Sequence, residues 1–160
     1  MPKKILIFGT IGAVAIGAVA ALYSLTQPSG PIFIEPTNRA LVVQGKAIYA
    51  NNCAACHGAS LQGQPNWRER LPNGRLPAPP HDKTGHTWHH PDAILTDIVK
   101  NGLVPGRTAP PGYESDMPAF GKSLSDEEIT AVLAYIKSTW PSKVLQLQKE
   151  VDLQQRKYRN

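Results

Sequence analysis

The chain has 160 residues and a formal net charge of +5, and it contains 15 prolines and 13 glycines. The excess positive charge lies at the two ends of the chain. Lys3 and Lys4 lie near its start, and residues 141–160 carry five basic against two acidic residues. The charges of residues 5–140 sum to zero. A neutral middle without interleaved basic and aromatic residues argues against a nucleic-acid partner, and the many turn residues predict long loops.

The first 27 residues predict a membrane anchor or a signal sequence. Two lysines precede an uncharged stretch, residues 5–25, which as a helix rising about 1.5 Å per residue matches the thickness of a bilayer. The lysines would stay in the cytoplasm and leave the remainder of the chain outside. The Ala-Val-Ala at 18–20 also suits cleavage by a signal peptidase. The length of the apolar run favours a retained anchor, and both interpretations predict an exported domain.

A linker and a first helix follow. Residues 28–37 are rich in proline and glycine and predict a flexible connection. Asn38 is suited to cap a helix, and apolar residues then recur at helical spacing over 39–52. This helix is expected to run directly into Cys53. Residues 58–90 are dense in glycine, proline and polar side chains and predict a long loop.

Two further core helices are predicted after that loop. His90 as cap and Pro91 in the first position open a helix that ends at Gly102. After a second loop, 102–120, Ser125 and Glu128 form a capping box for a helix that stops before proline 141. No stretch alternates like a strand, so the sequence predicts an all-α fold.

The tail, residues 141–160, predicts one more helix over 142–158. Apolar residues recur there at intervals of three and four, and Gln154 interrupts the series. We interpret this segment as a solvated terminal helix. A helix that docks on a partner subunit is the alternative.

The only two cysteines of the chain form the motif Cys53-x-x-Cys56-His57. This spacing is typical of a redox dithiol, half of a zinc site or a haem attachment point. A zinc site needs four ligands, and the later histidines are not spaced as in a compact zinc finger. A redox dithiol usually opens a helix among alternating strands, whereas here a helix precedes the motif and no strands are predicted. Haem attachment is therefore favoured over the other two interpretations.

Haem attachment makes a further demand on the sequence. The two cysteines would tether the haem, and the adjacent His57 would bind the iron on one side. A low-spin electron-transfer haem needs a sixth ligand, often a methionine. Apart from Met1, the chain has one methionine, Met117, in the sequence SDMPAFGK. We therefore predict one covalent haem c with His57 and Met117 as iron ligands.

Together these motifs resemble a class I cytochrome c. The likeness is carried by CAACH after a helix, by MPAFGK and by LSDEEITAVLAYIKS, and it covers about residues 38–140. It implies an all-α class I cytochrome c fold, in which the N- and C-terminal helices cross around a covalent haem, here preceded by an N-terminal transmembrane helix. Gly45 and Tyr49 match the family's crossing on the first helix, and Val132 and Tyr135 match it on the last.

The resemblance also suggests roles in the long loop. Trp88 is similar to a tryptophan with which some members hydrogen-bond a haem propionate, so we predict that it binds the cofactor. The family has a proline whose carbonyl orients the proximal histidine, and Pro79 or Pro80 corresponds to it. The insert over 58–90 leaves the choice between these two prolines open.

Two clusters of side chains in the same loop have alternative interpretations. Four histidines lie within ten residues: His81, His86, His89 and His90. They could hold copper or zinc, but we favour a polar loop over the haem edge. Three arginines precede them: Arg68, Arg70 and Arg75. They are interpreted either as partners of propionates or as solvated surface charge.

The sequence thus predicts an anchor or signal (1–27), a linker (28–37), a haem domain (38–140) and a tail helix (141–160). We expect a monohaem cytochrome in the bacterial inner membrane, with its haem domain on the periplasmic side. It would carry single electrons towards a terminal oxidase or another periplasmic acceptor in a respiratory chain. Its expected partners are redox proteins: an oxidase, a reductase or another cytochrome.

No enzymatic activity is expected, because both axial positions of the iron would be filled. One alternative is a haem or accessory subunit of a larger membrane redox complex. The other is a haem enzyme in which Met117 is a labile ligand.

Overall fold

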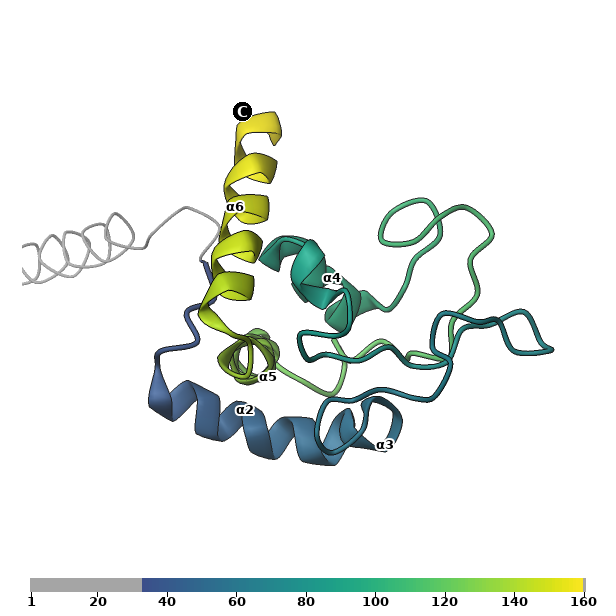
Figure 1. The fold of residues 1–160 in the computed structure, drawn as a ribbon, viewed down its shortest axis with the longest axis horizontal. Helices are drawn as coiled ribbons and strands as arrows, with labels where there is room; N and C mark the ends of the chain where they lie inside the picture. The colour runs from purple at the N-terminus through teal and green to yellow at the C-terminus, as the bar shows by residue number, and fades with distance from the viewer. Residues whose placement is uncertain (1–32, 160) are drawn as a thin grey trace, which may run out of the picture. The chain divides into compact units, whose positions relative to one another are not determined.

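The computed structural model describes residues 33–159, which belong to one compact unit (Figure 1). Its helices are, in chain order, α2 (Arg39–Asn52), α3 (Ala54–His57), the 3-10 helix η1 (Thr87–His89), α4 (Asp92–Asn101), α5 (Asp126–Ser138) and α6 (Ser142–Arg159). These residues contain one isolated bridge and no β-strand, so the predicted all-α class is confirmed for this part of the chain.

The predicted membrane anchor lies outside the described residues. Within residues 33–159, no helix combines the length and the apolar character that crossing a bilayer requires.

Helix α2 forms where the sequence predicts it. The Asn38 side chain caps it by accepting a hydrogen bond from the backbone N–H of Leu41 at 3.2 Å. Its buried residues, Gly45, Ile48 and Tyr49, lie three and four positions apart and therefore share one face.

Helices α2 and α5 cross in direct contact (Figure 1). A Cβ atom at Gly45 would lie 1.9 Å from the carbonyl oxygen of Ala131, so only a glycine allows the two backbones to approach this closely. The ring of Tyr49 packs on that of Tyr135 with a centroid distance of 5.4 Å, and Val132 is buried beside them. The predicted crossing, through these residues of the two helices, is confirmed.

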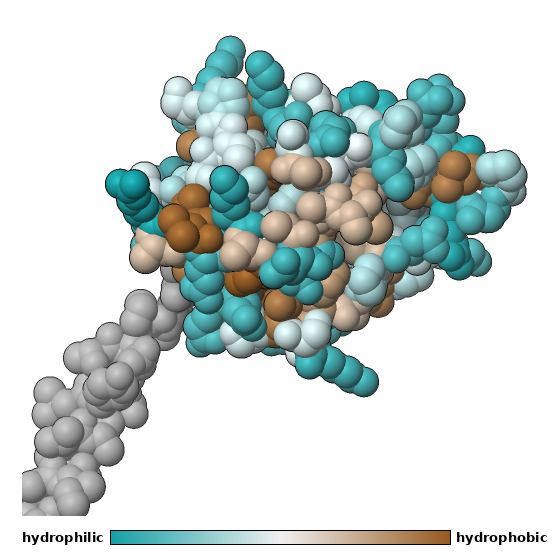
Figure 2. Space-filling model, turned by 90° about the horizontal axis from the view of Figure 1, so that it is seen from below, coloured by the Kyte–Doolittle hydropathy of each residue, from teal (hydrophilic) through white to brown (hydrophobic). Residues whose placement is uncertain are grey.

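The face of the domain on which α2 lies is mixed in character (Figure 2). Apolar residues form a band across it, bordered by hydrophilic residues. Val43 on α2 is among the exposed apolar side chains of the domain, and Ala55 and Cys56 on α3 are also exposed.

The capping box of α5 is present as predicted. The Ser125 hydroxyl accepts a hydrogen bond from the N–H of Glu128 at 3.2 Å, and the Glu128 carboxylate accepts one from the N–H of Ser125 at 2.8 Å. The helix ends at Ser138, slightly before the predicted stop at proline 141.

Helix α4 begins differently from the prediction. Pro91, and not His90, occupies the N-cap position, and no side chain of the preceding segment caps the helix. The N–H of Asp92 instead donates to the carboxylate of Asp152 in α6 at 2.7 Å. A distant helix therefore supplies the acceptor that a local cap normally provides. Gly102 ends α4 with a φ of 78°, as predicted.

The tail helix is present, but it is not the solvated helix that we predicted. Helix α6 packs on the domain through Gln148 and Asp152, which are both buried. Two members of its apolar series point outward, since Leu147 is 38% exposed and Tyr158 is 92% exposed. Val144 and Leu145 pack against the hydrophobic core at the start of the helix, so α6 docks by polar and apolar side chains together, and the apolar spacing alone does not identify its inner face.

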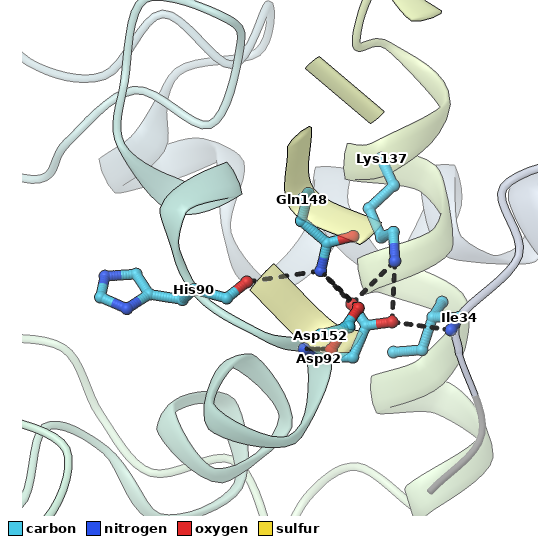
Figure 3. Close-up of polar contacts among 6 residues, drawn as sticks. All are labelled: Ile34, His90, Asp92, Lys137, Gln148 and Asp152. Atoms are coloured by element: carbon cyan, nitrogen blue, oxygen red, sulfur yellow. Dashed lines mark hydrogen bonds and ion pairs between the residues drawn. The ribbon is translucent and has the colours of Figure 1, made fainter. Parts of the chain in front are cut away.

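A buried polar cluster joins α4, α5 and α6 (Figure 3). The Lys137 ammonium donates to both carboxylate oxygens of Asp92 at 2.8 Å. The Gln148 amide donates to Asp92 at 2.9 Å and to Asp152 at 3.0 Å, and the N–H of Ile34 donates to Asp92 at 2.7 Å. One carboxylate thus binds three separate segments of the chain.

The charges of this cluster are removed from water. The Lys137 side chain is 0% exposed, and burial lowers its pKa while the nearby Asp92 carboxylate opposes this shift. Burial likewise raises the pKa of Asp152. A buried ion pair is costly to break, because the partner that remains keeps an uncompensated charge.

The helix crossing can be tested with Gly45→Ala. We expect a loss of roughly 1–3 kcal/mol or more in the free energy of unfolding, because the added methyl forces the α5 backbone away. Urea unfolding of the purified protein measures it. Val43→Ala on the exposed side of α2 is the control and is expected to change stability by less than about 0.5 kcal/mol. Equal effects of the two substitutions would contradict the crossing.

The buried cluster can be tested with Lys137→Met. This change leaves Asp92 charged and buried, so we expect a loss of about 3–5 kcal/mol in the free energy of unfolding. The control is Lys100→Met, which removes a lysine paired at 2.6 Å with Asp126 but with side chains 42% and 70% exposed. Its cost should stay below about 1 kcal/mol. A Lys137→Met protein as stable as the control would refute the role of the cluster.

Candidate functional site

The Cys-x-x-Cys-His motif occupies one short turn of helix directly after α2. The N–H of Cys53 still bonds to the carbonyl of Tyr49 at 2.9 Å, and the N–H of His57 bonds to the carbonyl of Cys53 at 2.9 Å. Cys53 is half-buried, Cys56 is exposed and His57 is 7% exposed. The motif therefore presents a thiol to the surface and an imidazole to the interior.

The imidazole of His57 is oriented by a backbone carbonyl. Its Nδ1 lies 2.8 Å from the oxygen of Pro79. A carbonyl only accepts, so Nδ1 carries the hydrogen and the lone pair of Nε2 is left for a metal. Of the two prolines left open by the sequence, the structure thus selects Pro79 over Pro80.

The environment of His57 favours the neutral imidazole. Burial lowers the pKa of His57, and the hydrogen bond to Pro79 opposes this shift. A neutral imidazole is the form that binds metals. Burial therefore favours the protonation state that the predicted proximal ligand needs.

Sequence reasoning missed the contact between His57 and His81. The two rings are stacked with a centroid distance of 3.9 Å and an interplanar angle of 25°. His81 is fixed in turn, because its Nδ1 lies 2.9 Å from the hydroxyl of Thr87 and its carbonyl accepts from the indole N–H of Trp140 at 2.7 Å. The position of His81, two residues after Pro79, is the only signal that could have identified it.

The chain that leaves the motif is fixed by two further hydrogen bonds. The Tyr49 hydroxyl donates to the carbonyl of Gly58 at 2.9 Å, and the N–H of Gly63 donates to the carbonyl of His57 at 2.8 Å. Gly58 has a φ of +81°, which a side chain would disfavour. The carbonyl of Gly58 is thereby tied to α2, and the carbonyl of His57 is tied to the following loop.

The environment of the Cys53 thiol weighs against a redox dithiol. Burial raises the pKa of Cys53 to about 11, and the neighbouring Cys56 adds to this shift. Reactive dithiols need a lowered thiol pKa. Cys53 instead has the character of a thiol that is kept protonated.

The structure also weighs against a zinc or copper site. Within residues 33–159, no group of three or more His, Cys, Asp or Glu side chains is placed to hold a metal ion. The histidines of the loop pack on aromatic rings. His86 stacks on Trp67 at a centroid distance of 5.5 Å, and His89 stacks on Trp88 at 3.6 Å.

Trp88 carries a buried polar group without a protein partner. It is half-buried in η1, and its indole Nε1 is shielded from solvent and makes no hydrogen bond among the described residues. Buried N–H groups are nearly always paired, so this one calls for an external acceptor. A carboxylate of a bound cofactor is such an acceptor.

Met117 lies on a separate segment beside the end of α4. It is half-buried, and its N–H donates to the hydroxyl of Ser115 at 3.1 Å. Its carbonyl lies beside Gly102, where a Cβ atom would be 3.6 Å from it, an ordinary van der Waals distance. The chain returns to α4 at Phe120, whose N–H donates to the carbonyl of Val99 at 3.0 Å.

The three arginines of the long loop contact protein groups. The guanidinium of Arg68 lies 4.0 Å from the ring centroid of Trp67, and that of Arg70 lies 5.9 Å from the ring of Tyr113. Arg75 bonds to Asp116 and faces a second carboxylate, that of Glu114. Arg75 therefore has carboxylate partners within the chain itself.

Comparison with known proteins finds relatives among cytochrome c proteins and subunits. The chain is 32% identical over 101 residues to the cbb3-type cytochrome c oxidase subunit CcoP of Azospirillum brasilense, covering 62% of this chain and 29% of that protein. It is 28% identical over 96 residues to a gluconate 2-dehydrogenase cytochrome c subunit of Pantoea cypripedii, covering 60% and 20%. It is 25% identical over 103 residues to cytochrome c-555 of Prosthecochloris aestuarii, covering 59% and 84%.

The chain thus spans less than a third of the oxidase and dehydrogenase subunits that it resembles. No solved structure gives a significant match. The model of the family described as Cytochrome c matches residues 42–140, which include the crossed helices, the Cys-x-x-Cys-His turn and Met117. The chain belongs to the cytochrome c family, and its covalent cofactor is accordingly haem c.

Proposed function

We propose that this protein is a single-electron carrier with one haem c, tethered by Cys53 and Cys56 and ligated by His57 and Met117. The observation that carries the proposal is the orientation of His57, whose Nδ1 is held by the Pro79 carbonyl at 2.8 Å. This bond fixes the orientation of the ring and leaves Nε2 as the nitrogen that would bind the iron. The cofactor, when bound, supplies the one-electron couple of the iron.

The residues of the chain supply orientation and a dry environment. Burial lowers the pKa of His57 and so favours its neutral form, and the stacked ring of His81 covers one of its faces. Trp88 would donate its unpaired indole N–H to a haem propionate. Met117 would fill the remaining axial position, so that no site is left open for a substrate. A filled sixth position supports electron transfer over catalysis at the iron.

We infer the partners and the cellular location of the protein from its similarity to known proteins and from its first residues. Two of the relatives named above are subunits of a cbb3-type oxidase and of a gluconate 2-dehydrogenase, which supports redox proteins as partners. The oxidase relatives and the apolar stretch at 1–27 support an inner-membrane protein with a periplasmic haem domain. Pro118 and Ala119, next to Met117, are exposed and would form part of an apolar contact rim.

A second candidate function is that of a haem subunit within a larger membrane redox complex. The names of two relatives favour it, because one is an oxidase subunit and the other is a dehydrogenase subunit. Purification in mild detergent separates the two functions. A stoichiometric partner that stays bound would support the subunit, and a monomeric haem protein would support the carrier.

Met117→Ala tests the axial assignment. We expect the optical signature of the methionine–ferric iron bond to vanish, the reduction potential to fall, and carbon monoxide to bind readily to the ferrous protein. Absorption spectroscopy and redox titration measure these changes. Val104→Ala, a half-buried residue of the same loop, is the control and should leave all three unchanged. An unchanged signature in Met117→Ala would show that another group is the sixth ligand.

Trp88→Phe tests the propionate contact. Loss of the donor leaves more negative charge on the propionate, which favours ferric iron. We therefore expect the potential to fall by roughly 20–60 mV, which corresponds to about a two- to tenfold change in the redox equilibrium. Trp67→Phe is the control, because the indole N–H of Trp67 is not among the buried groups that lack a partner. A potential equal to that of the wild type in Trp88→Phe would argue against this contact.

A further inference from the structure

The segment that carries Met117 has few backbone anchors of its own. Among the described residues, the backbone hydrogen bonds made within 110–118 are local, from Tyr113 to the carbonyl of Pro110 and from Met117 to the side chain of Ser115. The chain is tied to α4 again at Phe120 and Gly121. Side chains must therefore decide where this segment rests.

Arg75 supplies such a contact from the long loop. Its Nη1 bonds to the carboxylate of Asp116, the residue immediately before Met117. Its Nε lies 3.5 Å from the carboxylate of Glu114 and is itself shielded from solvent. The hydrogen bond to Asp116 and the two acidic charges raise the pKa of the Arg75 guanidinium. One planar cation thus bridges two acidic residues of the methionine segment.

The backbone around Arg75 is already folded to present this cation. The N–H of Leu71 donates to the carbonyl of Arg75 at 2.8 Å, and the N–H of Gly74 donates to the carbonyl of Leu71 at 2.8 Å. The N–H of Arg75 donates to the side chain of Asn73 at 3.0 Å. The turn over 71–75 therefore forms a support that exists independently of the methionine segment.

We propose that Arg75 is a positioning residue that holds the 110–118 segment so that Met117 stays on the haem iron. The proposal rests on the proposed function, in which Met117 is the sixth ligand. The Arg75 side chain is 36% exposed and the two carboxylates are 70% and 61% exposed, so the contact contributes little to global stability. Local opening of 110–118, however, requires only this contact and its few neighbours to break.

The test compares Arg75→Ala with Arg107→Ala. Arg107 pairs with Asp97 at 2.8 Å, so the two also form a surface arginine–aspartate pair, but Arg107 lies near the start of the loop that carries Met117, outside 110–118. Two readouts are used on the full-length haem protein. Imidazole added to the ferric protein competes with Met117, and amide hydrogen exchange reports the opening of 110–118.

We expect Arg75→Ala to bind imidazole about two- to fivefold more tightly and to exchange amides within 110–118 faster by a similar factor. The urea midpoint should stay near that of the wild type. Arg107→Ala should leave imidazole affinity and exchange at 110–118 unchanged. Raising the salt concentration should bring the wild type towards Arg75→Ala, because exposed charges are screened.

Exchanging the charges provides a rescue. Arg75→Glu and Asp116→Arg should each loosen the segment, and the double variant should restore slow exchange. Wild-type imidazole affinity and exchange in Arg75→Ala would overturn the proposal, and so would equal effects of Arg75→Ala and Arg107→Ala. The ligand assignment of Met117 and the positioning role of Arg75 are tested separately. If Met117 is not the ligand, the Met117→Ala variant shows it. Amide exchange at 110–118 tests the contact of Arg75 whichever group binds the iron.

Discussion

The close approach of α2 and α5 at Gly45 is the contact on which the haem site depends. The carbonyl of Ala131 occupies the space that a side chain at position 45 would need, so the crossing fixes both the separation and the rotation of α2. One turn later, Tyr49 rests on α5 through Tyr135 and donates its hydroxyl to Gly58, the residue after the motif histidine. A single tyrosine thereby transmits the helix crossing to the Cys-x-x-Cys-His turn.

The C-terminal end of α5 holds the remaining helices through buried polar contacts. Lys137 is directed at the carboxylate of Asp92, and that carboxylate also accepts from Gln148 on α6 and from the backbone of Ile34. Apolar contacts tolerate sliding, whereas directional bonds to one buried charge are satisfied in one arrangement. The α2–α5 contact brings the helices together, and the buried charge sets how α4 and α6 are placed on them.

The features that could be predicted from the sequence are those whose signal lies within one helix. The Asn38 cap, the Ser125 capping box and the glycine at the crossing all have local or family patterns. The polar part of the docking of α6 had none, since Gln148 and Asp152 are polar and each bonds to Asp92, 56 and 60 positions earlier in the chain. The choice of Pro79, the stacking of His81 and the bridge made by Arg75 lie in irregular loops, which have no periodicity to read.

The two proposed iron ligands are held in different ways. His57 lies in a helical turn, receives a backbone carbonyl at Nδ1 and is covered by a stacked ring. The Met117 segment is contacted by two arginines of the long loop, Arg75 at two exposed carboxylates and Arg70 at the ring of Tyr113. Contacts of the first kind persist through local opening, whereas contacts of the second kind weaken with salt and substitution. The difference between an electron carrier and a haem enzyme with a labile methionine therefore lies in a few loop contacts, since the helical frame would serve either function.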